Sequence, residues 1–281
     1  MVSTSTSVRY TVEALKSFAA CTRLRSDDRF FLIDNDASLG DGLPLVPHAE
    51  TITNDVPRGF ATNVNGILAR ARDVRADLFF LNNDLIFTRG WLEPLTTDMP
   101  AILSPLSNAE VSYSSGRLTC GFTMDLEDYL GRERELASIA DKHRRKHARG
   151  FLSFFSVPFF CVKLPYSVYS TVGDLDETFG PGGGEDKDYC VRAILAGFSV
   201  QYSLGSWVVH FQGRSTWRGA ETQEQTAKRD ETFVTTFRAK WGDALTKLFI
   251  YQDEKVVTEA GLDEVKQQGR LADIVRHLQG R

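Results

Sequence analysis

The sequence has few cysteines and none of the spacings that mark a disulfide framework or a zinc site. Its four cysteines in 281 residues are scattered, and no two of them form a Cys-x-x-Cys pair. Zinc sites and small disulfide scaffolds rely on such clustered spacings. The cysteines are therefore interpreted as small buried residues in a protein of a reducing compartment, namely Cys21, Cys120, Cys161 and Cys190.

The sequence also lacks long apolar runs and an excess of basic charge. No apolar run approaches the roughly 18 residues that a membrane span needs, and Met1–Ser7 lacks the charged-then-apolar pattern of a signal peptide. The net charge of −4 argues against a protein that binds nucleic acid through its overall charge. These absences predict a cytoplasmic globular protein with no transmembrane segment, and they leave open a peripheral position at a membrane.

What the sequence does contain is an alternation of short apolar runs and amphipathic segments. Strands are expected at residues 29–34, 50–53 and 77–81, and helices at residues 8–24 and 61–74. This alternation favours an α/β fold with a Rossmann-like, mostly parallel central sheet that is flanked by helices.

The second half of the chain is expected to continue this α/β pattern with further strands and helices. The strands are expected at residues 85–88, 101–104, 118–124, 198–203 and 207–210, with one or two more between 151 and 164 that are interrupted at Pro158. The helices are expected at residues 90–97, 130–149, 166–172, 185–197, 221–241 and 261–278.

One strand end stands out, because Asp77–Leu81 runs directly into Asn82, Asn83 and Asp84. In open α/β sheets, ligands bind at the carboxyl ends of the strands. Amide and carboxylate oxygens at that edge suit a hard divalent cation such as Mg²⁺ or Mn²⁺, and such a cation suits a diphosphate. The alternative is a polar turn that only ends the strand.

Ordered motifs in the first half of the chain carry a family resemblance. Phe31–Ser38 (FLIDNDAS) is similar to a strand end of the form V-D-N-x-S. Asn54–Gly66, which ends in GFATNVNG, then precedes Leu81–Asp84 (LNND) and Gly90–Glu93 (GWLE). Together these segments resemble the pattern N-x-G-F-a-x-x-N-x-G, then L-N-N-D, then G-W-L.

The second half of the chain completes the resemblance. Val172–Phe179 (VGDLDETF) and Pro181–Arg192 (PGGGEDKDYCVR) are followed by His210–Gly213 (HFQG) and Phe237–Gly242 (FRAKWG). The ordered set resembles the GT-A fold glycosyltransferases, and within them glycosyltransferase family 2, especially its rhamnosyltransferase-like branch. The family usually begins with a longer apolar strand, whereas only Val2–Ser7 occupies that place here.

The resemblance implies a domain organisation and a reaction. It implies a GT-A domain at residues 1–242, with a nucleotide-binding half at 1–100 and an acceptor and catalytic half at 101–242, followed by a helical extension at 243–281. It implies transfer of a sugar from a nucleotide-diphosphate sugar, such as a UDP- or dTDP-sugar, to a hydroxyl. The acceptor would be a saccharide, a lipid-linked molecule or another hydroxyl compound.

The resemblance also assigns the metal ligands. Asp84 would bind Mg²⁺ or Mn²⁺, and His210 would be a second ligand or a phosphate contact. Asn82 and Asn83 would contribute weaker contacts to the donor. For His210 taken alone, the simpler interpretation is a core histidine.

Asp186 matches the family position of the base that accepts the proton of the acceptor hydroxyl, and Glu185 would orient the donor or the acceptor. This arrangement implies a single displacement with inversion. The alternative for both is acidic charge that stabilises a helix start. Asp188 and Arg192 are expected to form a structural ion pair one helical turn apart.

Two further residues are candidates for contacts with the nucleotide. Asp34 occupies the family position that contacts the base or ribose, and its alternative is a turn aspartate with local backbone hydrogen bonds. Asn65, on the following helix, is a second and weaker candidate.

The run Lys142–Arg149 contains five Lys and Arg residues and no acid. A solvated helix face is the simpler interpretation. The sharper one is a landing site for an anionic acceptor or surface, with nucleic acid not excluded.

Two other functions are weighed for the whole chain, a catalytically silent nucleotide-sugar-binding module and a nucleotidyltransferase on a similar fold.

Overall fold

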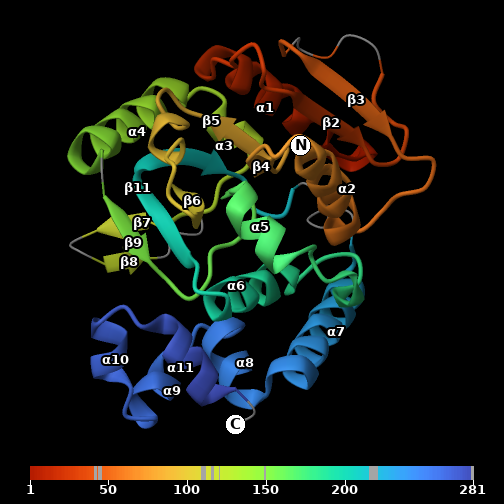
Figure 1. Cartoon of the computed structure of the whole chain (residues 1–281). Helices are drawn as coiled ribbons and strands as arrows, with labels where there is room; N and C mark the ends of the chain where they lie inside the picture. Colours follow the sequence, from red (N-terminus) through yellow and green to blue (C-terminus); the bar gives the residue numbers. More distant parts are fainter. Residues whose placement is uncertain are drawn as a thin grey trace.

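The computed structural model describes residues 1–40, 43, 46–108, 112–114, 117–119, 121–148, 150–214 and 221–279. Cys120 and Arg149 lie outside the described residues. The chain forms an α/β structure in which two adjoining sheets are flanked by helices, with a group of helices at the C-terminal end (Figure 1).

The first sheet is parallel, as the sequence predicts. Its strand order is β1–β2–β3, formed by β1 (Val2–Ser3), β2 (Phe30–Asp34) and β3 (Ala49–Thr53). Strand β1 has only two residues, so the expected shortening of the first strand is confirmed. Helices α1 (Val8–Cys21) and α2 (Phe60–Asp73) lie close to the expected ranges.

The second sheet is mixed, which differs from the mostly parallel sheet that we expected. Its order is β4–β10–β6–β11–β5, with β9 also pairing with β11. Among the described strands of this sheet, β6 and β11 pair in parallel, whereas β10 runs antiparallel to β4 and β6, and β5 and β9 run antiparallel to β11. The strands are β4 (Leu78–Leu81), β5 (Leu85–Phe87), β6 (Ala101–Ser107), β9 (Phe151–Ser153), β10 (Cys161–Leu164) and β11 (Ser199–His210).

A parallel bridge between Val2 and Asn82 joins the two sheets. It sets the carboxyl end of β1 beside the carboxyl end of β4. The polar strand end at Asn82 therefore faces the turn that follows β1, at the junction of the two sheets.

The remaining elements surround these sheets. A short hairpin of β7 (Ser112–Ser114) and β8 (Arg117–Thr119) leads to the helices of the second half. Those helices are α3 (Leu126–Tyr129), α4 (Glu133–His147), α5 (Tyr166–Val172), α6 (Glu185–Leu195), α7 (Gln223–Trp241), α8 (Asp243–Phe249), α9 (Lys255–Glu259), α10 (Asp263–Gln267) and α11 (Leu271–Leu278), with 3-10 turns η1 (Ser5–Ser7), η2 (Glu93–Leu95) and η3 (Glu177–Phe179).

Several expected elements have different boundaries. The helix expected at 90–97 is only the three-residue η2, which contains Pro94. The two strands expected at 198–203 and 207–210 are one strand, β11, with an irregular register between Ser203 and Trp207. The helix expected at 261–278 is two helices, because Gly269 adopts a left-handed φ of 71° between α10 and α11.

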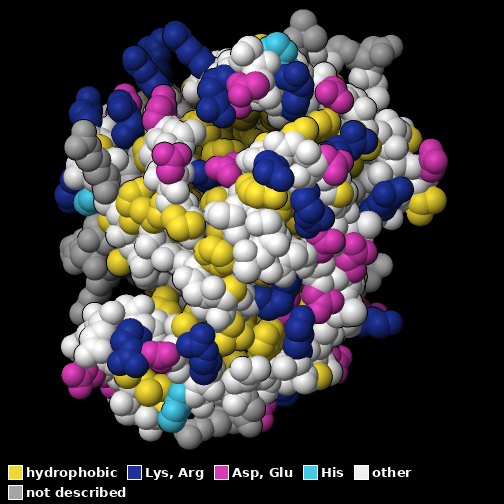
Figure 2. Space-filling view, in the orientation of Figure 1, with side chains coloured by type: hydrophobic (Ala, Val, Ile, Leu, Met, Phe, Trp, Pro, Cys, Tyr) yellow, Lys and Arg dark blue, Asp and Glu magenta, His cyan; other side chains and the backbone are white. Residues whose placement is uncertain are grey.

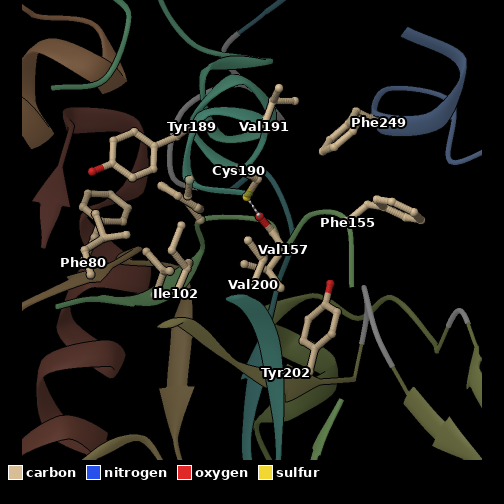
Figure 3. Close-up of a cluster of buried hydrophobic side chains, with 14 of the residues drawn as sticks. Phe80, Ile102, Phe155, Val157, Tyr189, Cys190, Val191, Val200, Tyr202 and Phe249 are labelled. Atoms are coloured by element: carbon tan, nitrogen blue, oxygen red, sulfur yellow. Dashed lines mark hydrogen bonds between the residues drawn. The ribbon is translucent and has the colours of Figure 1, made fainter. Parts of the chain in front are cut away.

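The main apolar core lies between the second sheet and α6 (Figure 3). Tyr189, Cys190 and Val191 of α6 are fully buried, and the Cys190 thiol donates to the carbonyl of Val157 at 3.9 Å. Each fully buried large apolar side chain contributes about 1.5–3 kcal/mol. The start of α6 is therefore attached to a well-packed body.

The C-terminal helices contribute to the same core. Phe249, Val257 and Val275 are buried in the cluster that contains the apolar face of α6. The division of the chain at residue 242 stays a prediction. None of the helices in the described part of the chain is both long enough and apolar enough to cross a lipid bilayer.

The expectation that the cysteines are buried is confirmed for two of the three that the structure describes, and the reducing compartment stays a prediction. Cys161 and Cys190 are buried, Cys21 is half-buried, and all three are free thiols. Burial raises the pKa of the Cys190 thiol to about 12. These thiols therefore stay protonated at neutral pH and behave as small apolar residues.

Candidate active site

Asp84 follows β4 and is completely buried. The backbone N–H of Arg214 donates to its Oδ2 at 2.8 Å, and Nε2 of His210 lies 3.3 Å from its Oδ1. Burial raises the pKa of Asp84, but His210 and the Arg214 N–H outweigh it and leave the pKa below its usual value. Asp84 is therefore an ionised carboxylate at the junction of the sheets.

Sheet pairing is what brings His210 to Asp84. His210 ends β11 and pairs with Leu85 of β5, which follows Asp84 directly. The imidazole stacks on the ring of Phe160 with centroids 4.7 Å apart, and its backbone N–H donates to Oδ1 of Asn108 at 2.7 Å. The structure thus brings together the two expected metal ligands, Asp84 and His210, which are 126 residues apart in the sequence.

These two side chains fit a divalent cation in part. A carboxylate oxygen and an imidazole nitrogen are suitable ligands for Mn²⁺ or Mg²⁺. The described residues contain no group of three or more His, Cys, Asp or Glu side chains that could hold a metal. Any cation at Asp84 and His210 therefore needs water or a bound diphosphate to complete its ligands.

Asn83 points away from this pair. It is completely buried, and its Nδ2 donates to Oγ of Ser7 and to Oγ1 of Thr11, both at 2.7 Å. These hydroxyls belong to the start of α1 and the turn before it. Asn83 therefore ties the strand end to α1, whereas Asn82 is half-buried and its backbone N–H donates to the Phe160 carbonyl at 2.7 Å. Donor contacts by either asparagine stay predictions.

Asp34 ends β2 and is also buried. Its Oδ1 accepts the N–H of Ser38 at 3.0 Å, and its Oδ2 accepts the N–H of Leu39 at 3.2 Å. This is the turn aspartate that the sequence analysis names as the alternative. A nucleotide contact by Asp34 stays a prediction, since each carboxylate oxygen can accept a second hydrogen bond.

Beside Asp34 the structure shows a group of buried asparagines that sequence reasoning did not identify. Oδ1 of Asn35 accepts hydrogen bonds from Nδ2 of Asn54 at 2.8 Å and of Asn63 at 3.0 Å. It also accepts the backbone N–H of Arg58 at 3.0 Å. The group fixes the loop before α2 against the end of β2. Asn54 and Asn63 lie within the matched motif, which was the available signal.

Asn65 does not face the strand ends. Its amide exchanges two hydrogen bonds with the backbone of Leu175, at 3.0 and 2.8 Å, and donates to Oε1 of Glu177 at 2.8 Å. Asn65 therefore connects α2 to the loop that leads into the glycine-rich segment. Its role as a nucleotide contact stays a prediction.

The glycine-rich segment Gly180–Gly184 precedes α6 and needs its glycines. Gly182, Gly183 and Gly184 have φ values of 155°, 122° and 84°, which residues with a side chain rarely adopt. The carbonyl of Pro181 accepts the N–H of Phe60 at 3.0 Å, so the segment also contacts the start of α2. This backbone path turns the chain sharply into Glu185.

Glu185 is the first residue of α6, and only 5% of its surface is exposed. Its Oε2 accepts the N–H of Gly183 at 2.5 Å. Burial, and then the neighbouring charge of Asp186, raise the pKa of Glu185 to about 7. Glu185 is therefore partly protonated near neutral pH and closes the glycine-rich segment back onto the helix.

Asp186 is the more accessible acid of the two. Its side chain is 18% exposed, its Oδ1 accepts the N–H of Lys187 at 2.7 Å, and Nζ of Lys187 lies 3.7 Å from its Oδ2. A carboxylate with one loosely placed cation can accept a proton from a bound hydroxyl. The expected ion pair between Asp188 and Arg192 is confirmed, with Nε and Oδ2 at 2.8 Å.

Two consecutive aromatic residues connect the two acidic groups. Phe160 stacks on His210, and Phe159 packs edge-on against Tyr189 of α6 with centroids 5.9 Å apart. The segment before β10 therefore contacts both the Asp84–His210 pair and the helix that begins with Glu185 and Asp186. The same short segment therefore packs against His210 on one side and against α6 on the other.

Arg214 was not identified from the sequence. Its backbone bonds to Asp84, and its guanidinium bonds to Oδ1 of Asp125 through Nη2 at 2.5 Å and Nε at 3.1 Å. Asp125 is the residue that precedes α3. Arg214 therefore contacts Asp84 through its backbone N–H, while its guanidinium is paired with Asp125. No motif in the sequence predicted a role for Arg214, because the His210–Gly213 match ends one residue before it.

The basic run lies in the last turns of α4. Lys142, Arg145 and Lys146 are exposed, and Arg144 pairs with Asp141 at 3.4 Å. Figure 2 shows Lys and Arg side chains at the upper left, where Figure 1 places α4, with Asp and Glu side chains among them. Cations at a helix C-terminus are themselves stabilising. The landing site for an anionic partner stays a prediction.

Comparisons with known proteins give matches at the level of structure. No family model and no curated protein matches the sequence. A structure of GalNAc-T7 with UDP, GalNAc and Mn²⁺ superposes with a TM-score of 0.53 and 14% identity over 88% of this chain and 48% of that one. Residues 1–349 of TarS from S. aureus, in complex with UDP-GlcNAc, superpose with a TM-score of 0.52 and 12% identity over 90% and 71% of the two chains.

The mannosyltransferase PcManGT from Pyrobaculum calidifontis, in complex with GDP-Man and Mn²⁺, matches with a TM-score of 0.50 and 12% identity over 85% and 62% of the two chains. The chain has the GT-A fold. It spans about half the length of GalNAc-T7. In this GT-A chain Phe160 stacks on His210, and the neighbouring Phe159 packs against Tyr189, which lies one helical turn after Glu185 on α6.

Proposed function

We propose that this GT-A protein is a glycosyltransferase of family 2 type, related to the rhamnosyltransferase-like branch. It moves a hexosyl or deoxyhexosyl group from a nucleoside-diphosphate sugar to a hydroxyl acceptor. One observation carries the proposal, namely that in a GT-A fold the segment Phe159–Phe160 contacts a buried Asp–His pair through His210 and contacts, through Tyr189, the helix that begins with Glu185 and Asp186.

Each pair supplies one requirement of the reaction. Asp84 and His210 would hold Mg²⁺ or Mn²⁺, which when bound stabilises the negative charge of the leaving diphosphate. Asp186 accepts the proton of the acceptor hydroxyl as its oxygen bonds to the anomeric carbon of the sugar. The bond to the diphosphate breaks in the same step, so the product is inverted.

The remaining residues orient and enclose the reactants. Glu185 holds the glycine-rich segment through Gly183 and leaves Asp186 as the accessible carboxylate. Asn83 holds the end of β4 through Ser7 and Thr11. In this proposal, Asp84 and Asp186 contact the reactants. Glu185 and Asn83 hold the backbone that carries these two aspartates.

A screen of nucleotide sugars tests the proposal. The neighbours are complexes with UDP, UDP-GlcNAc and GDP-Man, so the screen should contain UDP-, GDP- and dTDP-sugars with Mg²⁺ and with Mn²⁺. We expect one donor to raise the melting temperature and to be slowly hydrolysed in the absence of acceptor. Asp186→Asn should abolish hydrolysis while the shift in melting temperature remains.

Other outcomes separate the alternatives. A donor that binds to the wild type but is not hydrolysed would favour a silent binding module. Release of pyrophosphate from a nucleoside triphosphate would favour a nucleotidyltransferase. No binding of any nucleotide sugar would contradict the proposal.

A further inference from the structure

Asp188 is a completely buried carboxylate in the first turns of α6, two residues after Asp186. A buried charge needs partners, because its loss of hydration costs several kcal/mol. Arg192 supplies one partner from the same helix. The other two come from the end of α7, where Nε1 of Trp241 donates to Oδ1 at 2.8 Å and Nζ of Lys240 lies 2.7 Å from the same oxygen.

Lys240 has a second carboxylate partner on the other side of the glycine-rich segment. Its Nζ donates to Oδ2 of Asp176 at 2.5 Å. Asp176 in turn caps η3, since its Oδ1 accepts the N–H and the hydroxyl of Thr178 at 3.0 and 2.7 Å. One ammonium group therefore holds the chain just before Gly180–Gly184 and the chain just after it.

The same helix also covers the glycines between these two points. A Cβ atom on Gly183 would lie 2.7 Å from Cδ1 of Phe233 in α7, and one on Gly184 would lie 3.2 Å from the same ring. The glycine backbone and the Phe233 ring are thus in direct contact. Helix α7 fixes both stems of the segment through Lys240 and its middle through Phe233.

We propose that Lys240 is a positioning residue for the proposed transferase, and that its bridge between Asp176 and Asp188 sets the orientation of Asp186. This inference rests on the proposed function, because it takes Asp186 as the base. Asp186 lies between the glycine-rich segment and Asp188, so any movement of either stem moves its carboxylate. A misplacement of about 1 Å at a reacting group costs about a hundredfold in rate.

The test compares three variants with the wild type. Lys240→Met removes the ammonium and keeps the side-chain length, and Lys240→Arg keeps a cation that can bridge two carboxylates. Arg238→Met is the matched control, since Arg238 lies on the same helix and its ion pair with Asp243 is solvent-exposed. Turnover of the donor identified for the wild type gives kcat and KM.

We expect Lys240→Met to lower kcat by about a hundredfold and to change the KM for the donor by less than about twofold. Lys240→Arg should recover most of the lost kcat, and Arg238→Met should resemble the wild type. A kcat of Lys240→Met close to that of the wild type overturns the inference, and so does a loss that Lys240→Arg fails to recover.

A second variant covers the case in which Lys240→Met does not fold. Asp176→Asn removes only the loop side of the bridge and leaves Asp188 with Lys240, Arg192 and Trp241. We expect it to lower kcat by about tenfold and to raise amide hydrogen exchange in a peptide that contains Gly180–Gly184. Unchanged exchange in Asp176→Asn overturns the inference whether or not a donor is known. A wild type that turns over no nucleotide sugar instead contradicts the proposed function.

Discussion

Nε2 of His210 lies 3.3 Å from Oδ1 of Asp84, although Asp84 directly precedes β5 and His210 ends β11, which are far apart in the chain. The antiparallel pairing of β5 with β11 makes this contact, because it sets His210 opposite Leu85. Stacking on Phe160 fixes the plane of the imidazole. The contact thus combines an ionised carboxylate with an oriented nitrogen, which is what a partly completed cation site requires.

Asp84→Asn should therefore remove metal-dependent nucleotide binding without unfolding the protein. The asparagine oxygen can still accept the Arg214 N–H, whereas the negative charge is lost. We expect the affinity for UDP or GDP in the presence of Mn²⁺ to fall by about tenfold or more, and affinity without metal to change little. Titration calorimetry with and without Mn²⁺ measures both. The control is Glu264→Gln, which replaces an exposed carboxylate on α10 with an amide in the same way. Unchanged Mn²⁺-dependent affinity in Asp84→Asn would argue against Asp84 as a ligand.

Asp186→Asn should separate chemistry from binding. The amide keeps the shape of the carboxylate but cannot accept the proton of an acceptor hydroxyl. We expect kcat to fall by about a hundredfold to ten-thousandfold while the affinity for the donor stays close to that of the wild type. Steady-state turnover together with a donor titration measures the two effects. Near-normal turnover would mean that another group is the base.

The sequence predicts the elements well where local periodicity is strong. Helices α1, α2, α5 and α6 and strands β2, β3 and β4 lie within about three residues of their expected ends, a typical uncertainty for helix and strand boundaries. The helix predicted at Gly90–Thr97 was wrong. The apolar spacing there comes from Trp91 and Leu95, which are both buried although the chain between them forms only a proline-containing turn. The antiparallel β10 was not predictable, because strand direction depends on long-range pairing.

Side-chain direction at the candidate site could be inferred only in part. The family motifs predicted Asp84 and His210 as metal ligands, and the structure brings the two side chains together. The sequence could not show that Asn83 turns under α1 to reach Ser7 and Thr11. It could not show that Lys240 joins Asp176 to Asp188, because partners 52 and 64 positions away leave no local pattern.

The raised pKa of Glu185 leads to a prediction about stability and pH. Its pKa in the folded protein is about 7 against 4.5 as a free side chain, because of burial and then the charge of Asp186. Below pH 4.5 the residue is protonated in both states and costs nothing. As the pH rises from 4.5 to 7, the unfolded chain ionises first, so stability is lost across that window.

Glu185→Gln removes this loss, since the amide oxygen can still accept the Gly183 N–H. We expect the variant to gain up to about 3 kcal/mol over the wild type at pH 8 and to gain much less at pH 4.5. Urea unfolding at the two pH values measures the difference. Glu264→Gln, at an exposed position on α10, is measured alongside as the control. Equal effects of Glu185→Gln at both pH values would contradict a raised pKa.

Gly183 and Gly66 form a matched pair for a test of the glycine-rich segment. Gly183 has a φ of 122°, and an added Cβ would lie 2.7 Å from the Phe233 ring. Gly66 lies inside α2 with nothing within 4 Å of an added Cβ. Gly183→Ala should therefore cost about 1–3 kcal/mol in the free energy of unfolding, whereas Gly66→Ala should gain about 0.5–1 kcal/mol.

Urea unfolding of the two alanine variants measures both changes in stability. The double variant Gly183→Ala, Phe233→Ala separates the two causes of the expected loss. If contact with the ring dominates, the second substitution costs less in the Gly183→Ala background than in the wild type. If backbone strain dominates, the two costs add. A Gly183→Ala variant as stable as the wild type would show that the segment can adopt another path into α6. The close contact with α7 would then not be needed to hold Glu185 and Asp186 in place.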